Sequence, residues 1–261
     1  MKDYSDLYDY SGEDAVIPSG ELLEIEKVKW QDFPKYRTFF HGYEDFIGAT
    51  IPGELNIFSG TTGGGKTTLL KSMSMDYASQ GINTLWFSFE MTNYSFLQDF
   101  SEESLEHIFM PKTIPTKKLN WLEDRIVEAQ AKYGIKAIFV DHLHYLLDLG
   151  KIGRPSLEIG GLMRNLKLLT TNLNIITYLI AHPMKVKADA ELGTGDVRDS
   201  SFIEQEADNV AYLFRLKGSV NKTILKVTKA RKTFGACEFH PNNKFELEFR
   251  NRRYYEASKD V

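Results

Sequence analysis

Short apolar runs alternate with amphipathic segments between residues 55 and 215. Apolar residues fill runs that predict buried strands at residues 55–59, 84–89, 137–140, 175–181 and 209–215. In the intervening segments, apolar residues recur every three or four positions, which predicts helices at residues 66–80, 121–133 and 157–173. Strands that alternate with helices favour a mainly parallel sheet with helical crossovers.

The C-terminal part follows a different pattern. Three further apolar runs follow one another with only short connections, at residues 223–229, 236–240 and 245–249. Connections of this length leave no room for a helical crossover, so the runs predict antiparallel strands at one edge of the sheet. We therefore predict an α/β fold, with a mainly parallel central sheet flanked by helices and antiparallel strands at its C-terminal edge.

Charge is distributed unevenly along the chain. The formal net charge is −4, but the first 26 residues carry eight acidic side chains and one base. We predict an acidic arm or linker at residues 1–27 and a folded domain at residues 28–261. The arm is either a solvated tail or a segment that docks on a neighbouring subunit, and its charge alone leaves both open. Residues 215–233 carry seven bases and no acid, so an acidic total is compatible with binding phosphates.

Composition excludes several classes of protein. The chain is 42% hydrophobic and 26% charged, as is usual for a globular protein. Cys237 is the one cysteine, so neither an internal disulfide nor a four-thiolate zinc site is possible. The apolar runs are strand-sized, which predicts no membrane span or membrane partner. The polar, acidic N-terminus is unlike a signal peptide, so we expect a cytoplasmic protein (in the host if viral) or an organellar one.

Residues 60–67, GTTGGGKT, match the phosphate-binding pattern G-x-x-x-x-G-K-[ST] between a predicted strand and a predicted helix. Glycines let successive backbone N–H groups curl around a phosphate, and the helix N-terminus adds its positive dipole end. Lys66 supplies a mobile positive charge to the terminal phosphates of ATP or another nucleoside triphosphate. The predicted phosphate-binding residues are Gly60, Thr61, Thr62, Gly63, Gly64, Gly65, Lys66, Thr67 and Thr68.

Polar side chains at other strand ends supply the remaining chemistry of an ATPase. Asp141 and the Thr67 hydroxyl predict a Mg²⁺ site, because the carboxyl ends of parallel strands face one crevice. Glu90 ends the second predicted strand and is a candidate general base for water. His182 follows the fourth predicted strand and is a candidate hydrogen-bond donor to the γ-phosphate. By itself, a histidine in this position is more often structural.

The order of these motifs resembles that of DnaB-type replicative helicases. The ordered set comprises the loop at 60–67, FSFEM at 87–91, the strand ending at Asp141, AHP at 181–183 and EQEADN at 204–209. Segments 83–90 and 205–210 are similar to the Twinkle and phage helicase–primase branch of this family. The resemblance covers about residues 28–250. It implies a RecA-like fold and a ring, usually hexameric, with ATP bound between subunits.

The resemblance also implies roles for individual residues. It agrees with Glu90 as the group that activates water and with His182 as the group that senses the γ-phosphate. It adds a pair of cations from the neighbouring subunit, with Arg231 as arginine finger and Lys229 as its companion. Such cations stabilise the negative charge of the phosphoryl transition state. Without the resemblance, these bases would be interpreted as a solvated hairpin surface.

Two loops are expected to contact DNA in the central channel of such a ring. Residues 148–156 and 184–201 follow strand ends beside the predicted nucleotide site, so nucleotide state could move them. Cations there could contact the phosphates of a single strand. The candidate DNA-binding residues are Lys151, Arg154, Lys185, Lys187 and Arg198.

Taken together, the motifs predict an ATP- and Mg²⁺-dependent, ring-forming DNA helicase. The resemblance implies 5′ to 3′ movement on single-stranded DNA, unwinding of replication forks, and a primase or polymerase as a candidate partner. The alternative is a RecA- or KaiC-like ATPase whose ATP-driven assembly controls DNA pairing or a partner without unwinding.

Overall fold

The computed structural model of the chain describes residues 12, 15–31, 34–115, 119–142, 145, 155–182, 200–216, 218–219 and 221–257. The chain divides into two compact units, Met1–Pro34 and Lys35–Val261. In the first unit, helix α1 spans Ser19–Gln31, so the predicted boundary after residue 27 falls inside a helix. The other helices and strands belong to the second unit.

The second unit is built around one sheet. Its strands are β1 (Leu55–Gly60), β2 (Thr84–Ser88), β3 (Ile108–Phe109), β4 (Ala137–Asp141), β5 (Ile176–Ile180), β6 (Asn209–Arg215), β7 (Lys222–Ala230), β8 (Gly235–Ala236), β9 (Lys244–Arg250) and β10 (Arg253–Glu256). Its helices are α2 (His41–Ile47), α3 (Lys66–Ala78), α4 (Asn93–Leu97), α5 (Glu102–Leu105), α6 (Leu119–Tyr133), α7 (Pro155–Asn172) and α8 (Ser200–Glu206).

The strands lie in the order β10-β9-β7-β6-β1-β5-β4-β2-β3, and β8 pairs with β7. β1 lies near the middle and pairs in parallel with both β5 and β6. Parallel pairing continues through β4 and β2 to β3. On the other side, β6, β7, β9 and β10 pair in antiparallel fashion. The predicted α/β class, with a mainly parallel sheet and an antiparallel C-terminal edge, is confirmed.

The C-terminal edge differs in detail from the prediction. The run at residues 236–240 is not a full strand, because only Gly235 and Ala236 pair with β7 and Phe239 is 95% exposed. The amide of Asn243 instead satisfies the main-chain oxygens of Cys237 and Glu238.

Strand β10 is absent from the sequence prediction. It pairs with β9 across a two-residue turn, in which Asn251 and Arg252 have φ of 51° and 63°. Two successive residues with positive φ are typical of the tight hairpin turn whose twist matches that of the flanking strands. The predicted run ended at residue 249 because Arg252 follows Asn251 where the usual Asn-Gly hairpin signal has glycine.

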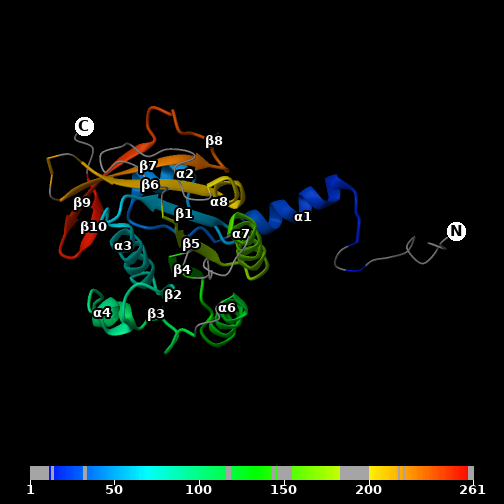
Figure 1. Cartoon of the computed structure of the whole chain (residues 1–261). Coiled ribbons are helices and arrows are strands. Elements are labelled where there is room, and N and C mark those ends of the chain that lie inside the picture. The colour runs from blue at the N-terminus through cyan, green and yellow to red at the C-terminus, as the bar shows by residue number, and fades with distance from the viewer. Residues whose placement is uncertain are drawn as a thin grey trace. The chain divides into compact units, whose positions relative to one another are not determined.

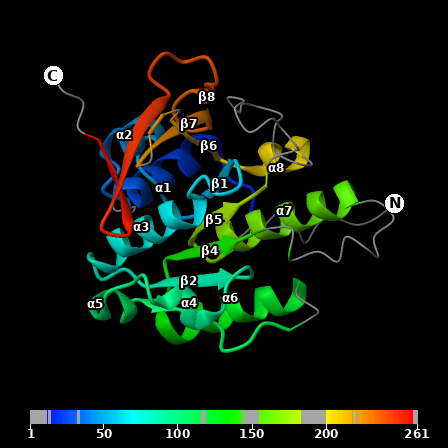
Figure 2. The same ribbon diagram turned by 60° about the vertical axis from the view of Figure 1, so that its left-hand side comes forward.

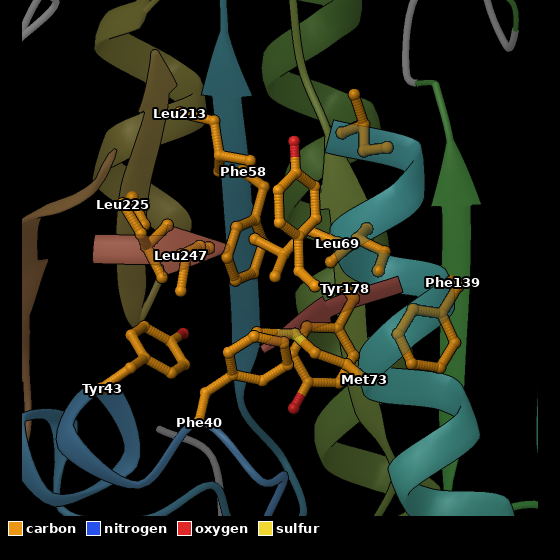
Figure 3. Packing of buried hydrophobic residues seen from close by; sticks show 14 of the residues in the cluster. Phe40, Tyr43, Phe58, Leu69, Met73, Phe139, Tyr178, Leu213, Leu225 and Leu247 are labelled. Atoms are coloured by element: carbon orange, nitrogen blue, oxygen red, sulfur yellow. The ribbon is translucent and has the colours of Figure 1, made fainter. Parts of the chain in front are cut away.

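Both faces of the sheet are buried under helices (Figure 1). On one face, Phe58 of β1 packs with Leu69 and Met73 of α3 (Figure 3). On the other face, Ile57 of β1 and Phe87 of β2 pack with residues of α6, α7 and α8. Successive strand residues point to opposite faces, so one strand serves both cores. This explains the continuous apolar runs that predicted the strands.

The hairpin formed by β9 and β10 is fastened to α3, as Figure 2 shows for β10. The Tyr254 backbone N–H donates to Ser72 Oγ over 2.9 Å. The Arg253 guanidinium pairs with the buried carboxylate of Asp76. Since α3 begins at the phosphate loop, these contacts bring the C-terminal edge of the sheet to the loop.

Two expectations from composition can be compared with the fold. Within the described residues, none of the helices combines the length and apolar character needed to cross a bilayer. Cys237 is a buried free thiol, and burial raises its pKa to about 11. It therefore stays protonated and weakly nucleophilic at neutral pH.

Candidate active site

The phosphate loop joins the end of β1 to the start of α3. Gly60, Gly63 and Gly65 have φ of 149°, 71° and 93°, which side-chain-bearing residues rarely adopt. A Cβ on Gly60 would also lie 2.1 Å from the Leu213 carbonyl oxygen of β6, so packing requires glycine there. Gly65 is the N-cap of α3, and the first free N–H groups of the helix therefore lie at the loop.

Lys66 is the first residue of α3, and its side chain turns back over the loop. The ammonium group donates to the carbonyl oxygens of Gly60 (2.9 Å) and Thr61 (3.1 Å). Burial lowers the pKa of this group, while the carboxylates of Asp141 and Glu90 act in the opposite direction. A phosphate bound in the loop would offer the ammonium a charged acceptor in place of two neutral ones.

Thr67 and Asp141 meet at the carboxyl edge of the sheet. The Thr67 hydroxyl donates to Asp141 Oδ2 over 2.6 Å, and Asp141 is only 2% exposed. Burial raises the pKa of Asp141 to about 6, against the lowering effects of the Thr67 hydrogen bond and the Lys66 charge. A hydroxyl and a carboxylate oxygen are hard ligands that fit Mg²⁺, so this pair could hold the predicted ion.

Glu90 faces two imidazole rings. Its Oε1 lies 2.9 Å from His142 Nδ1 and 3.6 Å from His182 Nε2. The two rings meet edge to face, with centroids 3.8 Å apart. His182 was among the predicted residues, whereas His142 was missed although it directly follows Asp141.

The predicted residues converge on one cavity of about 360 Å³. Those on its wall are Thr62, Gly63, Gly65, Lys66, Thr67, Thr68, Glu90, Asp141 and His182. Gly60, Thr61 and Gly64 belong to the same loop but do not line the cavity. The carboxyl ends of β1, β4 and β5 thus contribute to one site, as the parallel topology requires.

The antiparallel edge supplies a further wall, formed by Arg215, Phe249 and Tyr254. Phe249 is 38% exposed, and its ring meets the Tyr254 ring edge to face at 5.5 Å. The Tyr254 hydroxyl bonds to Thr223 Oγ1 at 3.0 Å, so this residue is both a core residue and a wall residue. Arg215 and Phe249 are not among the residues predicted from the sequence. An aromatic ring and a guanidinium beside the phosphate loop can both stack on a planar base.

Lys229 and Arg231 lie elsewhere, at the far end of the parallel strands. The Lys229 ammonium donates to the Glu204 carbonyl oxygen over 2.6 Å. Arg231 donates to Asp208 Oδ1 over 2.8 Å and to the Gln205 carbonyl oxygen over 3.0 Å. Burial is the main cause that lowers the pKa of Lys229, and the charge of Arg231 adds to it.

The strand register measures the separation between this pair and the phosphate loop. Gly60 pairs with Leu213, near the end of β6, whereas Ala230 pairs with Asn209, at its start. Four residues of strand correspond to about 13 Å. Lys229 and Arg231 are therefore not part of the cavity around their own phosphate loop.

The candidate DNA-binding residues Lys151, Arg154, Lys185, Lys187 and Arg198 lie outside the described residues. Described strands precede both segments. β4 ends at Asp141 and β5 ends at Ile180, both at the cavity.

Comparison with known sequences identifies related proteins. The sequence profile of the DnaB-like helicase C-terminal domain family matches residues 97–249, more than half of the chain. The replicative DNA helicase DnaB of Rickettsia typhi is 24% identical over 152 residues, which cover 57% of this chain and 30% of that protein. A probable plasmid replicative DNA helicase of Chlamydia psittaci is 31% identical over 100 residues, 37% of this chain and 22% of that protein. The chain thus spans about 30% of the length of the DnaB relative.

Solved structures show the same fold. One of them, described as an ATPase domain, superposes with a TM-score of 0.77 at 14% identity, covering 94% of this chain and all of that one. A DnaB-like replicative helicase, whose structure was described with its interactions with primase, gives a TM-score of 0.75 at 14% identity. This superposition covers 94% of this chain and 68% of the DnaB-like helicase chain. These similarities confirm the predicted RecA-like helicase ATPase fold.

Proposed function

The chain belongs to the DnaB-like helicase C-terminal domain family, and we propose that it is the ATP-hydrolysing motor of a replicative DNA helicase. The observation that carries this proposal is the single cavity shared by Lys66, Thr67, Glu90 and Asp141. The phosphate loop and Glu90 precede the stretch that matches the family profile. Their assignment therefore rests on geometry that is independent of that match.

We assign the chemistry to groups that already lie in place. The loop N–H groups and Lys66 hold the phosphates, and Thr67 and Asp141 hold Mg²⁺. The ion, when bound, would neutralise charge on the phosphates. Glu90 is 39% exposed, so its carboxylate can reach a water molecule in the cavity and accept its proton. His182 lies beside Glu90, where an imidazole can donate to a γ-phosphate oxygen.

Arg231 and Lys229 act, in this proposal, on the nucleotide of a neighbouring subunit. Their position at the opposite end of the strands from the phosphate loop supports action in trans, since their own loop is about 13 Å away along the sheet. The Arg231 side chain is 48% exposed although it pairs with Asp208, so a neighbour's phosphate could reach it. Hydrolysis would then depend on assembly into a ring.

The assembly and its substrate are part of the same proposal. We expect a homo-oligomeric, hexameric ring that moves 5′ to 3′ on single-stranded DNA and unwinds forked DNA. The DNA contacts fall to the segments after β4 and β5, with Lys151, Arg154, Lys185, Lys187 and Arg198. The strands that precede these segments, β4 and β5, end at the nucleotide cavity, which supports a link between nucleotide state and DNA binding.

The direct test is displacement of a strand from forked DNA, measured with ATP hydrolysis on the same sample. Single-stranded DNA should stimulate hydrolysis, and Glu90→Gln should lower turnover by about 10²–10⁴-fold while ATP binding persists. Glu123→Gln, on the exposed side of α6, is the matched control and should leave both activities unchanged. If single-stranded DNA does not change the rate of ATP hydrolysis in an assembled sample, the motor function is contradicted. That result would favour an ATPase that controls assembly.

A second experiment tests the shared site. Lys66→Ala and Arg231→Ala subunits, each inactive alone, should recover hydrolysis when mixed, because some interfaces then combine an intact loop with an intact finger. Particle mass before and after mixing checks that mixed assemblies form. Mixed assemblies without recovered hydrolysis would remove Arg231 from the role in trans.

A further inference from the structure

Three side chains of the kinds that bind metal ions converge beside the cavity, and two of them, Glu90 and His182, line it. Glu90 follows β2, His142 follows β4 and His182 follows β5, so three neighbouring strand ends supply them. One donor atom of each lies within 4.8 Å of the others. Among the described residues, no other group of three histidine, cysteine or acidic side chains meets in this way.

The spacing of these atoms fits a small divalent ion. Zinc binds imidazole nitrogen and carboxylate oxygen at about 2.0–2.1 Å, so two of its ligands in tetrahedral geometry lie about 3.3 Å apart. The Glu90 oxygen lies 2.9 Å from one imidazole nitrogen and 3.6 Å from the other. These two distances bracket the tetrahedral value, and all three donor atoms lie within 4.8 Å of one another. Rotation of the partly exposed Glu90 and His182 side chains could bring the three donors to zinc-binding distance.

We propose that Glu90, His142 and His182 form a binding site for a zinc-class divalent ion, and that an ion there blocks ATP hydrolysis. The binding part is independent of the proposed function, whereas the inhibition rests on it, because Glu90 is the assigned base. A carboxylate bound to a cation is a much weaker proton acceptor. His182, as a ligand, would no longer be available to the γ-phosphate.

The surroundings suit three protein ligands and one open position. The His142 side chain is 7% exposed, while those of Glu90 and His182 are 39% and 31% exposed and line the cavity. The open side can take a water molecule, as in zinc sites with two histidines and one glutamate. Asp141 adds a second carboxylate beside the site, and the Lys66 ammonium opposes binding with one positive charge.

This site differs in chemistry from the Thr67–Asp141 pair. Mg²⁺ prefers oxygen ligands, whereas two imidazoles select zinc, cobalt, nickel or copper. The two sites can therefore be distinguished by the ion used. Zinc should inhibit in the presence of excess Mg²⁺, and a chelator that is selective for zinc over magnesium should reverse the inhibition.

The test is a Zn²⁺ titration of the full-length, nucleotide-free protein by calorimetry, repeated with Co²⁺ as a coloured substitute. We expect one ion per chain and, with Co²⁺, visible bands typical of low coordination number. Glu90→Gln, His182→Leu and His142→Asn should each weaken binding by about tenfold or more. The matched control is His41→Gln, which removes an exposed imidazole at the start of α2 and should leave the affinity within twofold.

Several outcomes would overturn the proposal. One is a wild-type affinity no higher than that of the three variants. Another is a loss of Zn²⁺ affinity in the His41→Gln control as large as in the three site variants, which would indicate binding at the surface only. Thermal melts check folding, and Glu90→Gln remains informative if substitution of the buried His142 prevents folding. If Zn²⁺ binds through the three residues but the protein never hydrolyses ATP, the proposed function fails and the metal site stands.

Discussion

Asp141 carries a charge that the folded chain disfavours until a cation binds. Burial raises its pKa from 3.8 to about 6. The folded protein therefore binds a proton more tightly than the unfolded chain between these two values. For this group, stability is highest below pH 3.8 and falls as the pH rises through 6. Asp141→Asn removes the titration but keeps an oxygen that can accept the Thr67 hydrogen bond.

The magnitude follows from the shift of about two pKa units. Each unit corresponds to about 1.4 kcal/mol, so the ionised carboxylate costs about 3 kcal/mol of folding free energy above pH 7. At pH 5 about half of this cost is present, because the cost builds up between the unfolded and folded pKa values and pH 5 lies about midway between them. The stability of Asp141→Asn relative to wild type should therefore increase by about 1.5 kcal/mol between pH 5 and pH 7.5.

Urea unfolding at both pH values, without nucleotide and with a chelator present, measures this difference. Asp124→Asn, on the exposed side of α6, controls for the change in net charge and should show no comparable pH effect. Mg²⁺ at pH 7.5 should stabilise wild type but not Asp141→Asn, because the ion binds the ionised carboxylate. A relative stability that changes by less than about 0.5 kcal/mol between the two pH values would refute the reasoning, because the linkage requires about 1.5.

Three further substitutions test the packing of the phosphate loop and the ion pairs of Asp208. Gly60→Ala should lower the free energy of unfolding by about 3 kcal/mol or more, because the new Cβ would lie 2.1 Å from a carbonyl oxygen of β6. Gly63→Ala, where a Cβ meets nothing within 4 Å, should cost only about 1 kcal/mol, and equal losses in urea unfolding would contradict the steric argument. Asp208→Asn leaves Arg231 and Lys167 without their common carboxylate, so we expect a loss of about 2–4 kcal/mol. A loss that vanishes in 1 M salt would instead indicate a surface effect.

Five of the six strands with a parallel neighbour were predictable because they are buried on both faces, whereas the two-residue β3 was missed. Such strands read as continuous apolar runs, and β1, β2, β4, β5 and β6 all begin and end within one residue of the predicted bounds. The phosphate loop, Glu90, Asp141 and His182 follow from the same logic, since the carboxyl ends of parallel strands meet. The topology and the phosphate-loop motif were therefore enough to predict the half of the cavity that these residues form.

The other half was not predictable because it depends on contacts between distant segments. Phe249 and Tyr254 reach the cavity because β10 packs against α3, and the Asn251–Arg252 turn carries no strong signal. Arg215 reaches it because the end of β6 pairs with the end of β1. His142 was missed for another reason. A histidine after a strand-end aspartate has no distinctive spacing, and its partner Glu90 is far away in sequence.

Strand β1 ties the two ends of the proposed composite site together. At its carboxyl end it leads into the phosphate loop, and at its amino end the Leu55 N–H donates to Asp208 Oδ2, the carboxylate that also pairs with Arg231. The strand is flanked on both sides by parallel neighbours and is buried along its whole length. A strand held in this way cannot slip in register without turning its core side chains to the wrong face. The distance between the phosphate loop and Arg231 is therefore set by the core. This is what the proposed shared site requires, because its two halves would have to meet across each interface of the proposed ring.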